Sequence, residues 1–193
     1  MSNNYINHRG YVIHKNNVPD EQLSSIINDL NVKPFLPKSL GNTTSFLIYR
    51  ESINKYYLPR FFGINQFGPT NDNRIPKGTS INLQFTGNLR DYQTNIVNKY
   101  VSHVGTSGGG LLEIDTGLGK TVIALNIISR LNTKTLIIVH KEFLMNQWIE
   151  RIEQFMPDAK IGIIQQNKII IDNCDIVIAM LQSIAMKDYN PQI

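Results

Sequence analysis

The chain has 193 residues, enough for one good core or two small domains, and its 41% hydrophobic and 18% charged residues are typical of a globular protein. No run approaches the roughly 18 apolar residues of a membrane span, residues 1–17 lack the apolar stretch of a signal peptide, and the lone Cys174 excludes an internal disulfide. We therefore expect a soluble intracellular protein, whose net charge of +4 weakly favours polyanionic partners.

Residues 1–88 are predicted to form a small α+β accessory domain. Residues 20–30 combine an acidic start with the apolar spacing of a helix. Residues 45–50 and 81–85 have the patterns of strands, and residues 63–78 are rich in turn-forming glycine, proline and asparagine.

Basic and aromatic side chains are interleaved in this first domain. Such a mixture can bind nucleic acid, because rings stack on bases while cations contact phosphates. The same rings can instead form the domain core, with the basic stems at its surface, and we favour this second interpretation. The residues concerned are Tyr49, Arg50, Lys55, Tyr56, Tyr57, Arg60, Phe61, Phe62 and Lys77.

Residues 89–193 alternate helical and strand patterns. A helix is predicted at residues 89–104, followed by a flexible glycine-rich connector at 105–110. The later elements are predicted strands at 135–139, 161–164 and 175–180 and predicted helices at 122–131 and 142–156. Apolar strands that alternate with helices indicate a parallel sheet covered on both faces.

Residues 115–121, Asp-Thr-Gly-Leu-Gly-Lys-Thr, lie between a short apolar segment, 111–114, and the helical pattern at 122–131. A strand, a glycine loop and a helix with Lys-Thr at its start form the context of a phosphate-binding P-loop. Glycines allow the backbone to curl around an anion, and a helix N-terminus favours phosphate. The pattern therefore predicts an ATP site at this loop.

Each residue type of the loop has a predicted role. Lys120 would reach the β- and γ-phosphates, and the Thr121 hydroxyl would ligate Mg²⁺. These two are the predicted catalytic residues. The chain departs from the general pattern at Ile114, where that pattern has glycine. The alternative is an ordinary glycine turn before a core helix. The predicted nucleotide contacts in the loop are Thr116, Gly117, Leu118, Gly119, Lys120 and Thr121.

Four segments occur together in an order that resembles superfamily 2 helicases: LRDYQ (89–93), DTGLGKT (115–121), LIIVHKEFLMNQW (136–148) and IVIAMLQSIAM (176–186). The chain is most similar to the XPB type and to helicases of large DNA viruses, including the poxvirus transcript-release helicase. The resemblance implies a P-loop RecA-like parallel sheet, the first motor domain, at residues 89–193. ATP would bind at the edge of this sheet, and DNA or RNA would cross its top.

The same resemblance implies roles for residues outside the loop. Gln93 would read the adenine edge with Arg90 beside it, since an amide both donates and accepts hydrogen bonds; alternatively, Gln93 is a solvated helix residue. Lys141 would contact nucleic-acid phosphates, with a solvated loop lysine as the alternative. Gln182 and Ser183 match a further nucleic-acid motif, just past the carboxyl end of a strand, where ligands gather in open α/β sheets.

The family's Asp-Glu-x-His or Asp-Glu-x-Asp motif and its second RecA-like domain, with an arginine finger, do not occur in these 193 residues. Phosphoryl transfer needs several such charge-stabilising groups together. We therefore expect the N-terminal part of a longer protein, which alone binds nucleotide weakly, hydrolyses almost none and leaves its P-loop strand with an exposed apolar edge. Two other classes remain open: another P-loop NTPase, such as a kinase, and a noncatalytic nucleic-acid-binding module.

Overall fold

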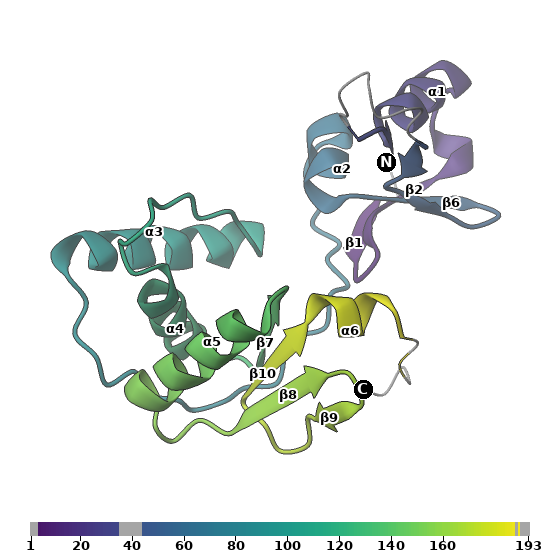
Figure 1. Cartoon of the computed structure of the whole chain (residues 1–193). Helices are drawn as coiled ribbons and strands as arrows, with labels where there is room; N and C mark the ends of the chain where they lie inside the picture. The colour runs from purple at the N-terminus through teal and green to yellow at the C-terminus, as the bar shows by residue number, and fades with distance from the viewer. Residues whose placement is uncertain (1–3, 35–43, 188, 190–193) are drawn as a thin grey trace. The chain divides into compact units, whose positions relative to one another are not determined.

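The computed structural model describes residues 4–34, 44–187 and 189 (Figure 1). The chain divides into two compact units, residues 1–77 and 78–193. No helix in the described part of the chain is both long and apolar enough to span a membrane.

The first unit contains an antiparallel sheet with the strand order β1-β2-β6-β5 and a separate ribbon of β3 and β4. Its elements are β1 (Tyr5–Asn7), β2 (Gly10–His14), the 3-10 helix η1 (Lys15–Asn17), α1 (Asp20–Asp29), β3 (Asn31–Val32), β4 (Phe46–Leu47), β5 (Arg50–Glu51), β6 (Lys55–Leu58) and α2 (Arg60–Phe67).

The predicted helix at 20–30 is confirmed as α1, but two other predictions in this unit are wrong. The predicted strand at 45–50 is divided, because β4 pairs with β3 whereas β5 pairs with β6. The turn-rich stretch at 63–78 begins inside α2, where Gly63 allows close packing: a Cβ atom there would lie 2.3 Å from the Cβ atom of Tyr11. The β1–β2 hairpin, residues 5–14, lies where no strand was predicted, although Tyr11, Val12 and Ile13 of β2 are apolar and buried.

The core of the first unit contains three of the five aromatic residues singled out from the sequence. Tyr56 is 7% exposed, and Tyr49 and Phe62 pack against the same cluster. The core interpretation is therefore confirmed for these three rings. Phe61 is exposed, and Tyr57 is half-buried on the other face of the sheet.

The second unit contains a sheet with the order β7-β10-β8-β9, in which β7, β10 and β8 are parallel and β9 is antiparallel. Its elements are α3 (Asp91–Ser107), α4 (Lys120–Leu131), β7 (Thr135–Val139), α5 (Glu142–Phe155), β8 (Ile161–Gln165), β9 (Lys168–Ile170), β10 (Ile176–Met180) and α6 (Leu181–Ala185). The parallel α/β architecture predicted from the sequence is confirmed.

Helices α4 and α5 cover one face of this sheet (Figure 1). Their buried side chains, Leu125 on α4 and Ile152 on α5, pack in one cluster with Ile178 of β10. The other face has a smaller cluster under α6, and Leu136 and Ile138 of β7 are each 52% exposed there. Within the described residues, helices therefore cover one face of the sheet fully and the other only in part, whereas the sequence predicted cover on both faces.

Two predicted strands of this unit do not form. Residues 111–114 pair with no strand of the described chain; Leu111 is 92% exposed, while Leu112 and Ile114 pack towards α3. Residues 81–85 alternate in burial around Leu83, which is 3% exposed, yet they also lack a strand ladder. Both predictions were wrong because a pattern of side chains indicates only an extended backbone. A strand also needs a neighbouring strand to accept and donate its backbone hydrogen bonds.

The boundaries around α3 also differ from the sequence prediction. Residues 78–88 were assigned to the first domain, but they pack on the second unit, where Ser129 Oγ donates a hydrogen bond of 2.8 Å to Leu83 O. The predicted connector at 105–110 is partly helical: α3 continues to Ser107 and ends at Gly108, which has the left-handed conformation of a C-cap.

Candidate nucleotide-binding site

The glycine loop turns into α4 through two residues with positive φ. Gly117 has φ +85° and Gly119 has φ +80°, a region in which residues with a Cβ atom are strained. A Cβ atom on Gly117 would meet no heavy atom within 4 Å, so the loop is open on that side. Of the backbone N–H groups from 116 to 119, the described hydrogen bonds use one, from Leu118 N to Asp115 O across 3.5 Å.

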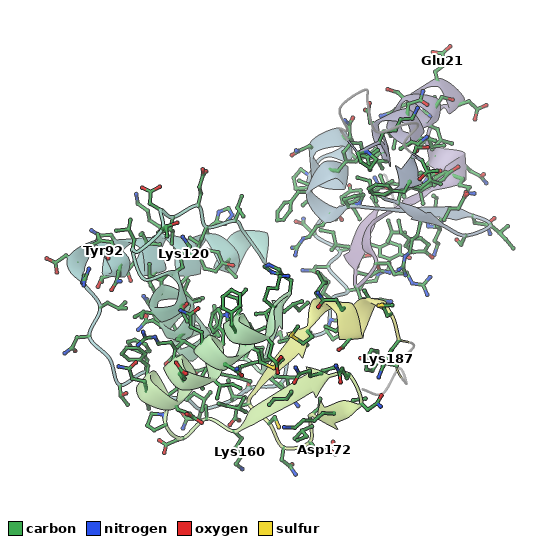
Figure 2. The ribbon with its side chains drawn as sticks, viewed as in Figure 1. Glu21, Tyr92, Lys120, Lys160, Asp172 and Lys187 are labelled. Atoms are coloured by element: carbon green, nitrogen blue, oxygen red, sulfur yellow. The ribbon has the colours of Figure 1, made fainter. Side chains whose placement is uncertain are left out.

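Lys120 is the first residue of α4, and its side chain is exposed (Figure 2). Its Nζ donates to Ile114 O at 2.8 Å and to Asp115 O at 3.1 Å. Both acceptors are neutral carbonyl groups, and neither of the ion pairs in the described chain involves this lysine. Its positive charge is thus available to an anion. Thr121, the other residue assigned to catalysis, follows directly and is half-buried.

The N-terminus of α3 is bonded to the loop through Gln93. This side chain is 5% exposed; its Oε1 accepts from Arg90 N at 3.0 Å, and its Nε2 donates to Leu118 O at 3.1 Å. A Cβ atom on Gly119 would lie 2.6 Å from the same Nε2. The burial of Gln93 excludes the alternative of a solvated helix residue. Its adenine contact, and that of the exposed Arg90, stay predictions.

Tyr92 is a residue of this site that the sequence analysis missed. Its hydroxyl donates to Leu118 O at 3.2 Å, so two donors converge on one carbonyl oxygen. A trans peptide group places its C=O and N–H on opposite sides, and the described chain has no cis peptide bonds. Tyr92 and Gln93 therefore hold the Gly119 N–H directed away from α3. The position of Tyr92 within LRDYQ, beside Gln93, was the available signal.

A cavity of about 200 Å³ lies between this corner of α3 and the loop. Typical drug-sized pockets are about 300–1,000 Å³, so this one has room for a single ring system. Its walls mix polar side chains, loop backbone and an aromatic ring. The lining residues are Asn88, Arg90, Tyr92, Gln93, Gly117, Leu118, Gly119, Val122 and Phe155.

The residues predicted to contact nucleic acid lie at the carboxyl edge of the sheet. Strands β7 and β10 end in register, and Gln182 Nε2 beyond β10 donates to His140 O beyond β7 at 3.0 Å. Lys141 is exposed directly before α5. Ser183 is 8% exposed, and its Oγ accepts from Gln166 N at 2.8 Å. The structure thus brings Lys141 and Gln182 to one edge, while Ser183 supports the turn after β8.

Comparisons with known proteins place these features in a family. Residues 86–192 match the family described as type III restriction enzyme, res subunit. A protein of Acanthamoeba polyphaga mimivirus, named as a candidate ATP-dependent RNA helicase, aligns with the whole chain at 34% sequence identity. The alignment covers 39% of the length of that protein. A candidate helicase of Invertebrate iridescent virus 3 aligns with 82% of the chain at 29% sequence identity, and the alignment covers 52% of that helicase.

Two further similarities come from archaea. The DNA 3′-5′ translocase XPB2 of Sulfurisphaera tokodaii is 40% identical to this chain in the aligned segment. That segment covers 39% of this chain and 16% of the translocase. The SWI2/SNF2 ATPase core of Sulfolobus solfataricus, solved with double-stranded DNA, aligns with 57% of this chain and 24% of its own at 24% identity and a TM-score of 0.48. The predicted resemblance to superfamily 2 helicases of the XPB and large-DNA-virus types is confirmed. The chain spans 39% and 52% of the length of the mimivirus and iridescent-virus relatives.

Proposed function

Because this chain belongs to the family described as type III restriction enzyme, res subunit, we propose that it is the ATP-binding part of a nucleic-acid helicase or translocase. Its relatives are named as helicases and as a translocase. The observation that carries the proposal is Lys120, which begins α4 after two left-handed glycines and has only neutral acceptors.

The residues of the loop fit a nucleotide triphosphate. Backbone N–H groups at the start of α4 have no acceptor within the helix, and the helix dipole favours an anion at that end. Lys120 would exchange its two carbonyl acceptors for phosphate oxygens, which form stronger, charge-assisted bonds with an ammonium group. The base would enter the cavity beside Arg90 and Gln93.

Mg²⁺ would be held by the Thr121 hydroxyl together with the phosphates. When bound, the ion neutralises the charge that develops on the phosphate oxygens. The described residues contain no group of three or more His, Cys, Asp or Glu side chains that could hold a metal. This donor set suits an ion that arrives with ATP and keeps several waters, as Mg²⁺ commonly does.

The nucleic-acid track of the proposed motor runs along the carboxyl edge of the sheet. Lys141 supplies a positive charge there, and Gln182 is fixed by its bond to His140 O. Ser183 acts by positioning the turn that follows β8. We expect these 193 residues alone to bind nucleotide and hydrolyse very little, since phosphoryl transfer requires charge-stabilising groups beyond the loop.

The test is a titration of the chain with a fluorescent ATP analogue and Mg²⁺, comparing wild type with Lys120→Ala. A hydrogen bond to a charged group contributes about 1.5–3 kcal/mol, so we expect Lys120→Ala to weaken binding by roughly 10- to 150-fold. Lys160→Ala, at an exposed lysine before β8, removes the same charge and should leave the affinity unchanged. Wild-type affinity in Lys120→Ala would contradict the proposal.

An assay on a protein with the full length of the viral relatives, of which this chain spans 39% and 52%, distinguishes the motor role from that of another P-loop NTPase, such as a kinase. We expect DNA or RNA to stimulate the ATPase activity of that full-length protein, and we expect Lys141→Ala to reduce this stimulation while the basal rate persists. A basal ATPase activity that no nucleic acid alters would favour the other class.

A further inference from the structure

The formal charge of the chain is concentrated in its first unit. Residues 1–77 contain nine lysines and arginines against five aspartates and glutamates, whereas residues 78–193 contain ten of each. The whole net charge of +4 therefore belongs to the first unit, which does not contain the P-loop. This excess favours a polyanionic partner for the first unit.

Most acidic residues of the first unit lie on the helix side of its sheet. Helix α1 carries Asp20, Glu21 and Asp29, which are three of the five acidic residues, and Figure 2 shows Glu21 directed away from the sheet. The same helix packs through Ile26 into the core that contains Ile13 of β2. One face of the sheet is therefore covered by an acidic helix.

The opposite face carries a row of residues across all four strands. The register pairs Tyr5 with Val12, Val12 with Tyr57, and Tyr57 with Arg50. Directly paired residues of antiparallel strands share a face, and so do residues two positions apart on one strand. Lys55, two positions from Tyr57 on β6, therefore belongs to the same face.

Cations cover the tyrosine rings of this face. The Lys55 Nζ lies 5.4 Å from the centre of the Tyr5 ring and donates to the Tyr5 hydroxyl at 3.1 Å. The Arg74 guanidinium lies 3.7 Å from that ring, and the Arg9 guanidinium lies 5.3 Å from the centre of the Tyr57 ring. Because Tyr5 is only 6% exposed, the face offers positive charge more than open rings for stacking.

Three cations of this face, Arg9, Arg50 and Lys55, have no carboxylate partner among the described residues. Arg74 is paired with Asp72, with 2.6 Å between Nη2 and Oδ2. Arg9, Arg50 and Lys55 form no ion pair within the described part of the chain. Tyrosine rings hold Arg9 and Lys55, and Arg50 lies on β5 of the sheet, which lowers the conformational entropy that these charges would lose on binding an anion.

We propose that Arg9, Arg50 and Lys55 form a cationic face that binds the phosphate backbone of nucleic acid without reading its sequence. Phosphates are favoured over bases because the cations occupy the ring faces that stacking would need. This binding is separate from the nucleotide site and does not require ATP. It gives the first unit a role in holding nucleic acid.

The experiment measures binding of the nucleotide-free 193-residue chain to a fluorescein-labelled single strand by anisotropy, over a range of salt concentrations. Each released counterion contributes about 0.7 to the slope of log K against log salt for single strands. We expect Arg9→Gln/Arg50→Gln to lower the affinity equally for different base sequences and to reduce the slope by about 1.4. Lys55→Gln should reduce the slope by about 0.7.

Two control variants make the test specific. Lys33→Gln removes one charge from an exposed position beyond β3 and should leave the slope unchanged. Lys160→Gln, at an exposed lysine of the second unit, should also leave it unchanged. Because the chain is free of nucleotide in this experiment, the result does not depend on the nucleotide site. Wild-type binding by the Arg9→Gln/Arg50→Gln variant would overturn the proposal. So would capture by anionic phospholipid vesicles under conditions in which no oligonucleotide binds.

Discussion

Gly119→Ala tests the contact between the loop and α3, and Gly117→Ala is its matched control. Both glycines have φ near +80°, where a Cβ atom costs about 1–2 kcal/mol. Alanine also makes the unfolded chain less flexible, which offsets about 0.4–1 kcal/mol of that cost. Because a Cβ atom on Gly117 meets nothing within 4 Å, we expect Gly117→Ala to lower the free energy of unfolding by roughly 1 kcal/mol.

At Gly119 a second cost is added to this backbone strain. The new Cβ atom would lie 2.6 Å from Gln93 Nε2, so the amide must move and lose its bond to Leu118 O. A buried amide left without its partner costs about 1–3 kcal/mol, and Gln93 is 5% exposed. We therefore expect Gly119→Ala to lower the free energy of unfolding by roughly 2–4 kcal/mol in total.

Trp148 provides the assay, because it is the only tryptophan of the chain and packs against the core of the second unit. Its fluorescence during urea unfolding reports that unit without a signal from the first. In Gln93→Ala/Gly119→Ala the clash is absent, so the double substitution should cost less than the sum of the single ones by about 0.5–3 kcal/mol. Equal losses in Gly117→Ala and Gly119→Ala, with additive double-mutant values, would refute the proposed contact.

Three other predictions follow from the packing and the charges. Gly63→Ala should destabilise the first unit by about 1–3 kcal/mol or more, measured by thermal unfolding, because its Cβ atom would collide with the Cβ atom of Tyr11. Gly105→Ala, at an exposed position inside α3 with nothing within 4 Å, should stabilise the second unit by about 0.5–1 kcal/mol in the tryptophan assay. The hydrogen bond from Arg74 lowers the pKa of Asp72, so this pair stabilises the fold above the unfolded pKa of about 3.9 and ceases to do so as pH falls through the lower folded value. An NMR titration should show the Asp72 pKa returning towards about 3.9 in Arg74→Ala.

The helices and strands that the sequence predicted correctly are those whose sequence patterns lie within the element itself. The segments that became α4 and α5 have the apolar periodicity of helices, and those that became β7 and β10 are continuous apolar runs. The structure places all four within two residues of the prediction. The strand predicted at 111–114 depended on a neighbour, which local pattern cannot supply.

In the candidate site, too, the sequence indicated which residues matter but not which residues they contact. The Gly-Lys-Thr triplet predicted a phosphate loop, because phosphate chemistry restricts residue types at fixed spacing. The two donors on the Leu118 carbonyl join residues 25 or 26 positions apart, and no sequence spacing encodes that contact. Ser183 was selected by its motif, whereas its buried hydrogen bond to Gln166 N became visible only after β8 and β10 were paired.

The anchoring of the loop has a consequence for how the nucleotide site is formed. Leu112 and Ile114, which precede the loop, pack in one cluster with Val97 of α3, and Leu118 O is held by Tyr92 and Gln93. Contacts with α3 thus orient the loop although its preceding segment pairs with no described strand. Since the Gly119 N–H direction follows from the Leu118 carbonyl, contacts with α3 set the direction of this N–H group in the candidate nucleotide site. Nucleotide affinity in this chain should therefore respond to Tyr92→Phe, which removes one donor, more than to changes in the exposed side chains of β7.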